Sequence, residues 1–534
     1  MQKVNLICLI AGIFISITGN AQFKVQPDRK SVQVQIINGT IEGNIEPGGV
    51  YSFKGIPYAA PPVGDLRWKA PEPARDWKGV LQTKRFGASP MQPAIYKDMV
   101  FRSSGMSEDC LFLNVWAPSK PHKNKLPVFV YFHGGGFIAG DGSEPRYDGE
   151  SMAAKGIVMV TVNYRLGIFG FLTLPGLDKE SPWHSSGNYG LLDQNAALKW
   201  VHKNIAAFGG DPSRVTIGGQ SAGSMSVSSQ MASPLSKGLF ARAIGESGSV
   251  LGNLLPRSLK ASEKMGAAFL SMANASGVED LRKMPADKLL KIYSLPDAPR
   301  FGPTIDGYFF PHSPAYIYER GLQADVPLLA GWNSAEVSYR QLLKKELPTP
   351  DNYKKAVTGL YGKYADKLLK LYPGNSSDEV VKSATELAGD RFIAYATWKW
   401  IFAHSITDGY PVYRYVYKHL LPPAIDTGIN GVSGNIGAPH SAEIPYALGN
   451  LNLVKAYRWT ADDYKVSATM QAYFVNFIKT GNPNGNGLPQ WFGLQSSIPK
   501  VMNIDTKSGS EPEQNLKRYL LLDEINAVQL KDRE

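Results

Sequence analysis

The chain has 534 residues, of which 43% are hydrophobic and 19% are charged, and its formal net charge is +11. This composition is typical of a globular protein with a large core, and it excludes a disordered or fibrous chain. The basic residues form no dense block with interleaved aromatic residues. The nearest to one is Lys120–Lys125, which has the character of a solvated loop before a strand. We therefore expect no nucleic-acid partner.

Residues 1–21 have the pattern of a secretory signal peptide. Lys3 supplies the positive charge, Val4–Ile17 is apolar, and Gly19–Ala21 supplies small residues before a cleavage site. The apolar run is too short for a membrane span of about 20 residues, and no other run approaches that length. We expect cleavage near Ala21 and a secreted or periplasmic protein without stable membrane insertion. The alternative is that the segment stays as an N-terminal anchor.

The chain has two cysteines, Cys8 and Cys110. Cys8 lies inside the signal segment and follows Asn5–Ile7, which lack the small residues expected before a lipid-attachment cysteine. The mature chain is therefore expected to keep Cys110 alone and to form no internal disulfide. This suits an exported bacterial enzyme better than a disulfide-rich extracellular protein.

Strand and helix patterns alternate along the chain. The N-terminal third has strand and turn patterns, with alternation at period two over Val32–Ile37. A helical pattern covers Tyr189–Phe208. Apolar runs of strand length lie before and after this helix, at Leu126–Phe132, Ile157–Val162, Val215–Ile217, Ala241–Ile244, Val326–Ala330 and Val412–Tyr417. This alternation predicts the α/β class, with a mostly parallel central sheet flanked by helices.

Residues 252–320 and 341–410 have helical or irregular patterns between predicted strands. We expect them to be large insertions over the sheet that form the walls and lid of a pocket. No linker divides the chain, so residues 22–534 are predicted to be one domain.

Ser221 is the most informative residue for function. It lies in Gly219–Gly223, which has the form G-x-S-x-G, directly after the predicted strand Val215–Ile217. The residues after it, Ser224–Met231, can form a helix. A serine on a sharp turn from strand to helix projects its hydroxyl above the sheet edge, and the glycines allow the backbones to pass. Ser221 is therefore a candidate nucleophile.

A serine nucleophile needs donors that stabilise the oxyanion. Three consecutive glycines, Gly134–Gly136, follow the predicted strand Leu126–Phe132, and such a run leaves backbone N–H groups exposed. We predict an oxyanion hole formed by the N–H groups of Gly135, Gly136 and Ala222. The alternative is that the glycines form a flexible turn.

The nucleophile also needs a base and an orienting acid. His440 lies in a Gly/Pro-rich loop after the last strong strand, where an α/β-hydrolase order of Ser, acid and His places the base. Glu336 follows the predicted strand Val326–Ala330 in an apolar, aromatic loop, where a carboxylate is costly unless it has a partner.

These motifs resemble the signatures of the type-B carboxylesterase family, which includes carboxylesterases, cholinesterases and some fungal lipases. The resemblance runs from about residue 30 to the C-terminus. The matching stretches are Phe53–Tyr58, Glu108–Val115, His133–Phe137, Asn163–Gly167, Arg214–Gly223, Gly245–Gly248 and Thr480–Pro483. It implies an α/β-hydrolase fold, Ser221 as nucleophile, Glu336 as acid and His440 as base. Ser247 matches a serine that supports the triad, although it could equally be part of a turn. No metal or cofactor is implied.

Two departures from the family pattern limit the substrate. Many members pair the counterpart of Cys110 with an earlier cysteine, but Phe86–Gln92 contains none and has Pro90 near that position. The loop from Pro90 to Cys110 is short and has no Trp, whereas cholinesterases place a choline-binding Trp there. These departures argue against cholinesterase activity and against a disulfide-hinged lipase lid.

We therefore expect a serine carboxylic-ester hydrolase acting through an acyl-enzyme, with short-chain neutral esters as substrates. A rival from another class is a catalytically inactive adhesion or binding protein on the same fold, but such relatives typically lack the nucleophile. A lipase or a polysaccharide-deacylating esterase could use the same machinery. Nothing in the sequence specifies the oligomeric state.

Overall fold

The structure is a computed structural model that describes residues 24–25, 31–120, 122–407, 409–425, 436–495 and 499–531. The predicted signal peptide lies outside the described residues. Within those residues, none of the helices combines the length and the apolar character that crossing a membrane requires.

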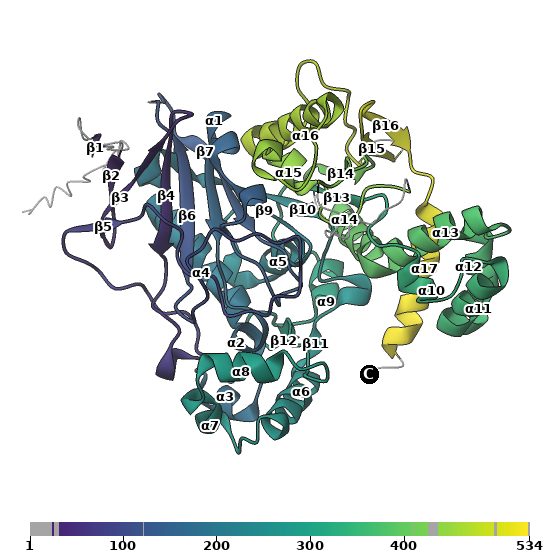
Figure 1. The fold of residues 1–534 in the computed structure, drawn as a ribbon, viewed down its shortest axis with the longest axis horizontal. Coiled ribbons are helices and arrows are strands. Elements are labelled where there is room, and N and C mark those ends of the chain that lie inside the picture. The colour runs from purple at the N-terminus through teal and green to yellow at the C-terminus, as the bar shows by residue number, and fades with distance from the viewer. Residues whose placement is uncertain are drawn as a thin grey trace, which may run out of the picture.

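One large sheet organises the part of the chain that the structure describes (Figure 1). Seven neighbouring strands are parallel, in the order β8, β7, β9, β10, β13, β14, β15. Their bounds are Val158–Val162, Leu126–Phe132, Gly210–Gln220, Arg242–Glu246, Leu328–Asn333, Val412–Tyr417 and Lys500–Ile504. The prediction of an α/β fold with a mostly parallel sheet is confirmed.

Antiparallel strands extend the sheet at both ends. On the N-terminal side β6 pairs with β8, then β4, β3 and β2 follow; on the other side β16 pairs with β15. These strands are Phe112–Pro118, Val50–Pro57, Gly39–Glu46, Ser31–Ile36 and Gly509–Pro512. The short strands β1 (Lys24–Val25) and β5 (Val80–Gln82) pair with β2 and β3. The N-terminal third thus continues the central sheet.

The alternation of side chains along β7 explains why helices cover both faces of the sheet. Val128, Val130 and Phe132 belong to one apolar cluster, whereas Phe129 and Tyr131 belong to a second. The helices α4 (Tyr189–Asn204) and α5 (Ala222–Ala232) pack in the first cluster; α1 (Glu150–Ala154), α15 (Ile444–Ala447) and α16 (Ala461–Thr480) pack in the second. Because helices cover both faces of a parallel sheet, its central strands are expected to be buried on both sides.

The two predicted insertions are mainly helical. The first contains α6 (Leu259–Met272), α7 (Val278–Lys283), α8 (Ala286–Tyr293) and α9 (Pro314–Glu319). The second contains α10 (Arg340–Leu343), α11 (Pro350–Tyr361), α12 (Ala365–Leu371), α13 (Ser377–Gly389), a π-helical turn at Asp390–Ala394 and α14 (Tyr395–Thr407). In Figure 1, α6–α8 gather below the sheet and α10–α13 lie at the right edge with the C-terminal helix α17 (Leu516–Lys531).

Candidate active site

The candidate residues lie beyond the carboxyl ends of neighbouring parallel strands. Ser221 directly follows β9, and the glycine run Gly134–Gly136 begins two residues after the end of β7. Ser247 follows β10, Glu336 follows β13, and His440 lies in the loop that precedes α15. This edge is where ligands bind in open α/β sheets, because several loops converge there from different strands.

Ser221 has a strained backbone that the surrounding glycines make possible. Its φ is 57° and its ψ is −122°, a left-handed conformation that a residue with a side chain rarely adopts. A Cβ on Gly219 would lie 2.6 Å from the Phe132 carbonyl oxygen, and one on Gly223 would overlap the same oxygen. The Ser221 N–H donates to the carbonyl of Glu246 at 2.8 Å. The turn therefore packs tightly against β7 and β10.

The glycine run lies against this turn. A Cβ on Gly134 would lie 3.2 Å from the Ser221 Cβ. Gly135 and Gly136 have φ values of 106° and 65°. Among the described residues, the N–H groups of Gly135, Gly136 and Ala222 donate to no protein acceptor. Three free donors close to the serine are what an oxyanion requires.

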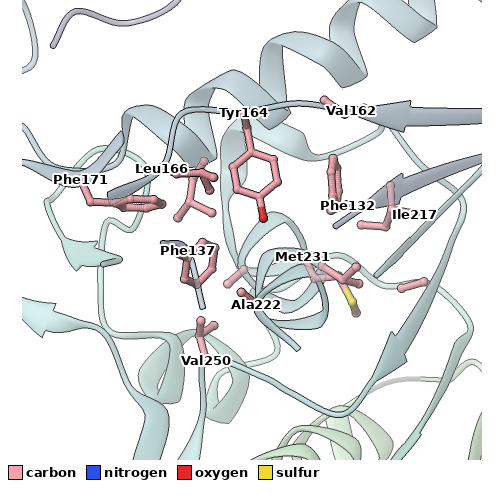
Figure 2. Packing of buried hydrophobic residues seen from close by; sticks show 14 of the residues in the cluster. Phe132, Phe137, Val162, Tyr164, Leu166, Phe171, Ile217, Ala222, Met231 and Val250 are labelled. Atoms are coloured by element: carbon pink, nitrogen blue, oxygen red, sulfur yellow. The ribbon is translucent and has the colours of Figure 1, made fainter. Parts of the chain in front are cut away.

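One neighbouring segment, Asn163–Gly167, holds both ends of the glycine run. Figure 2 shows Tyr164 and Leu166 of this segment beside Phe132 and Phe137, which flank the run. The Tyr164 hydroxyl donates to the carbonyl of His133 at 2.6 Å. The rings of these two residues stack with their centroids 4.3 Å apart. The Gly167 N–H donates to the carbonyl of Phe137 at 2.7 Å. Burial lowers the pKa of His133 to about 4, so the ring is neutral. The stretch Asn163–Gly167, which the sequence singled out, thus fixes this loop.

Glu336 and His440 are in direct contact. His440 Nδ1 lies 2.5 Å from Glu336 Oε2. The other oxygen of Glu336 accepts from the Ser247 hydroxyl at 2.6 Å and from the Asn333 N–H at 2.7 Å. Glu336 is buried, at 2% exposure, so these bonds compensate for its lost hydration. Ser247, predicted as a supporting residue, contacts the carboxylate directly.

The bond to Glu336 determines which tautomer His440 adopts when neutral. Nδ1–H donates to the carboxylate, so Nε2 is left to accept a proton. The amide of Gln220, the residue before Ser221, lies 3.3 Å from this Nε2. In the part of the chain that the structure describes, no hydrogen bond joins the Ser221 hydroxyl to the imidazole. Catalytic hydrogen bonds are often loose without substrate.

Three further side chains lie around the site that sequence reasoning did not single out. The Tyr96 hydroxyl would lie 3.3 Å from a Cβ on Gly136, and Met99 Cε 3.1 Å from one on Gly135. The Phe392 ring stands nearly perpendicular to His440, with centroids 5.2 Å apart. Tyr96 and Met99 come from the loop between Pro90 and Cys110, which has no Trp. The presence of Tyr96 there was the available signal.

Comparison with known proteins identifies the family of this chain. A model of the carboxylesterase family matches residues 29–520. The chain belongs to the carboxylesterase family. Among its relatives, fumonisin B1 esterase of Sphingopyxis macrogoltabida is 37% identical, with 89% of this chain and 86% of the relative covered. Para-nitrobenzyl esterase of Bacillus subtilis is 36% identical, with 88% and 94% covered.

Solved structures support the same assignment. A para-nitrobenzyl esterase structure matches with a TM-score of 0.77 and 34% identity, covering 92% of this chain and 99% of that one. A thermophilic para-nitrobenzyl esterase also matches with a TM-score of 0.77. This carboxylesterase therefore has the α/β-hydrolase fold, and it is a carboxylic ester hydrolase.

Proposed function

We propose that this carboxylesterase hydrolyses short-chain neutral esters through an acyl-enzyme on Ser221, with His440 as base and Glu336 as the orienting acid. The observation that supports this best is the bond between Glu336 and His440 Nδ1 beside the strained Ser221 turn. The family membership makes ester hydrolysis the reaction class.

In the proposed reaction, His440 Nε2 takes the Ser221 proton as Oγ attacks the ester carbonyl. The N–H groups of Gly135, Gly136 and Ala222 stabilise the resulting oxyanion. The tetrahedral intermediate collapses, the imidazolium protonates the leaving alcohol, and Ser221 keeps the acyl group. Water, deprotonated by His440, then attacks the acyl-enzyme and releases the acid and free Ser221. Glu336 stays ionised throughout and stabilises the imidazolium.

The uncharged side chains beside the glycine run and His440 support a neutral substrate. Tyr96 and Met99 lie over the glycine run, and Phe392 lies beside His440. A site lined by such side chains binds an apolar acyl or alcohol group, because burying a charge there would cost free energy without a partner. A relative named for para-nitrobenzyl esters fits this class of substrate.

A fluorophosphonate probe tests the nucleophile. We expect a single adduct at Ser221 and complete loss of ester hydrolysis, with Ser221→Ala neither labelled nor active. Ser247→Ala is the matched control, because it removes a hydroxyl from the same site but should still be labelled. An adduct on Ser247 or elsewhere would refute the assignment, and failure of the folded protein to react would favour the inactive binding protein.

A panel of esters tests the substrate class. We expect acetyl to butyryl nitrophenyl esters to be the best substrates and choline esters to be no better than uncharged esters of the same acyl group. A rate that rises only above the solubility limit of long-chain glycerides would identify a lipase instead. Release of acetate from acetylated polysaccharides would identify the deacylating alternative.

We also propose that residues 1–21 are removed on export and that residues 22–534 form the mature domain. The support is the positive, apolar and small-residue order at the N-terminus. Mass spectrometry of the protein recovered from the periplasm or medium should find Gln22 at the N-terminus. Retention of the full chain in a membrane fraction would favour an N-terminal anchor.

A further inference from the structure

Asn333 ends β13 three residues before Glu336, and it bonds to Glu336 and to the residue directly before His440. Its backbone N–H donates to Glu336 Oε1 at 2.7 Å. Its side-chain Nδ2 donates to the carbonyl of Pro439 at 2.7 Å, directly before His440. The same Nδ2 donates to Glu443 Oε2 at 2.5 Å, three residues after His440. One buried residue therefore links the acid, the backbone of the base and a second carboxylate.

Backbone contacts align the same two loops. The Ala335 N–H donates to the carbonyl of Ala438 at 2.9 Å, and the His440 N–H donates to the carbonyl of Glu336 at 3.2 Å. The hydroxyl of Ser334 accepts from the Ala438 N–H at 2.9 Å. These bonds set the loops side by side, but none of them reaches the chain beyond His440. The Asn333 side chain spans His440 from Pro439 to Glu443.

Glu443 is a buried carboxylate that packing alone does not require. It is 0% exposed, and its Oε1 has no hydrogen-bond partner among the described residues. Burial and the charge of Glu336 raise the pKa of Glu443 to about 7. Such a group is costly, so its presence next to the His440 loop calls for a role in the site.

Several other titratable groups face Glu443 and His440. They come from the loop after β13, from β7, β10 and β14, and from the 3₁₀ turn Pro145–Tyr147: Glu336, Tyr131, Glu246, Tyr415, Tyr417 and Arg146. Burial raises the pKa of Glu246 and of the three tyrosines. Arg146 is paired with Glu144 at 2.7 Å.

We propose that Asn333 and Glu443 are positioning residues for the catalytic histidine. Asn333 links the loop that carries His440 to the end of β13, three residues before Glu336. Glu443 accepts from Asn333 on the far side of His440 and adds negative charge near the imidazole. The inference rests on the proposed triad, in which a small displacement of the base is costly. Misplacing a reacting group by about 1 Å can lower the rate by about 100-fold.

The first experiment removes the Asn333 side chain that links the two loops. Asn333→Ala should lower kcat by about 10- to 100-fold and leave KM within about threefold, because the base is displaced while the substrate walls are intact. Asn195→Ala is the matched control: Asn195 is buried in α4 and its Nδ2 also donates to two acceptors, the Leu235 carbonyl and the Ser236 hydroxyl, away from the triad. Its kcat should stay within about threefold of wild type. A kcat that Asn333→Ala leaves unchanged would overturn the role of Asn333.

The second experiment keeps the hydrogen bond from Asn333 to residue 443 and removes the charge of Glu443. In Glu443→Gln the amide oxygen still accepts from Asn333, so the loop stays in place and the variant can be measured even if Asn333→Ala does not fold. Glu443 contributes to the raised pKa of His440, so the acid limb of kcat/KM should move to lower pH. An unchanged acid limb would overturn the role of Glu443. Fluorophosphonate labelling of the wild type at Ser221 separates either result from failure of the triad itself.

Discussion

Two opposing effects act on the pKa of His440. Burial disfavours the imidazolium, but the charge and hydrogen bond of Glu336 favour it more, so the pKa is raised above its usual value of 6.5. The proposed base must be neutral to accept the Ser221 proton. Activity should therefore be full above the raised pKa and fall as the pH drops through it. We expect the acid limb of kcat/KM to lie above pH 6.5, and a profile flat down to pH 5 would exclude a histidine base.

Glu336→Gln tests the charge that stabilises the imidazolium. The amide can still accept from Ser247 and the Asn333 N–H, so the fold should survive. The corresponding change in a Ser-His-Asp triad lowers kcat by about 10⁴-fold, and we expect a loss of several orders of magnitude here. The acid limb should also move to lower pH, because the carboxylate no longer raises the pKa of His440. Activity within a few-fold of wild type would place the acid elsewhere.

The sequence predicted the residues whose roles follow from motif and order. Ser221 stood in a G-x-S-x-G turn after a strand, and His440 and Glu336 stood in loops after later strands. The sequence did not reveal the links between those loops. Asn333 and Glu443 have no local pattern that marks them, because their contact depends on β13 and β14 being neighbours in the sheet. Tyr96 likewise lies in no motif that marks it.

At the scale of elements, the close contact between the Ser221 turn and β7 can be tested at Gly223. Gly223→Ala adds a methyl group that overlaps the Phe132 carbonyl oxygen. We expect the free energy of unfolding to fall by about 1–3 kcal/mol or more and the activity to be lost. Denaturant unfolding and nitrophenyl ester hydrolysis measure both effects.

Gly359→Ala is the matched control for this substitution. Gly359 lies inside the exposed part of α11, and a Cβ there would meet nothing within 4 Å. The change should raise the free energy of unfolding by about 0.5–1 kcal/mol, because alanine is the better helix former. If both variants lose stability equally, close packing at the turn is not the cause.

Element type was easier to predict than sheet membership. The six apolar runs all lie in or overlap strands of the parallel part, and the helical pattern Tyr189–Phe208 corresponds to α4 and a 3₁₀ turn, Ile205–Phe208. Hydrophobic periodicity reports burial locally, so it identifies such elements. Hydrophobic periodicity does not indicate which strands pair with each other in the sheet. The joining of β2, β3 and β4 to the central sheet through β6 was therefore not foreseen.

At the scale of the whole molecule, the lone cysteine leads to a prediction about redox conditions. Cys110 is buried and free, and burial raises the pKa of its thiol well above the usual range. With residues 1–21 removed, no second cysteine exists in the chain. Dithiothreitol should change neither the activity nor the Tm, and iodoacetamide should react only after unfolding. A Tm that falls with reductant would indicate a disulfide between two molecules.

The order of the strands also governs when the enzyme becomes active during its synthesis. Ser221 and the glycine run are translated in the first half of the chain, whereas His440 comes late and reaches them only after β13 and β14 have joined the sheet. Long-range pairing of this kind is slow, since the loop entropy is lost before the contacts form. A nascent or truncated chain that ends before residue 440 therefore holds the proposed nucleophile without the proposed base, so under this proposal ester turnover reports completed assembly of the native topology.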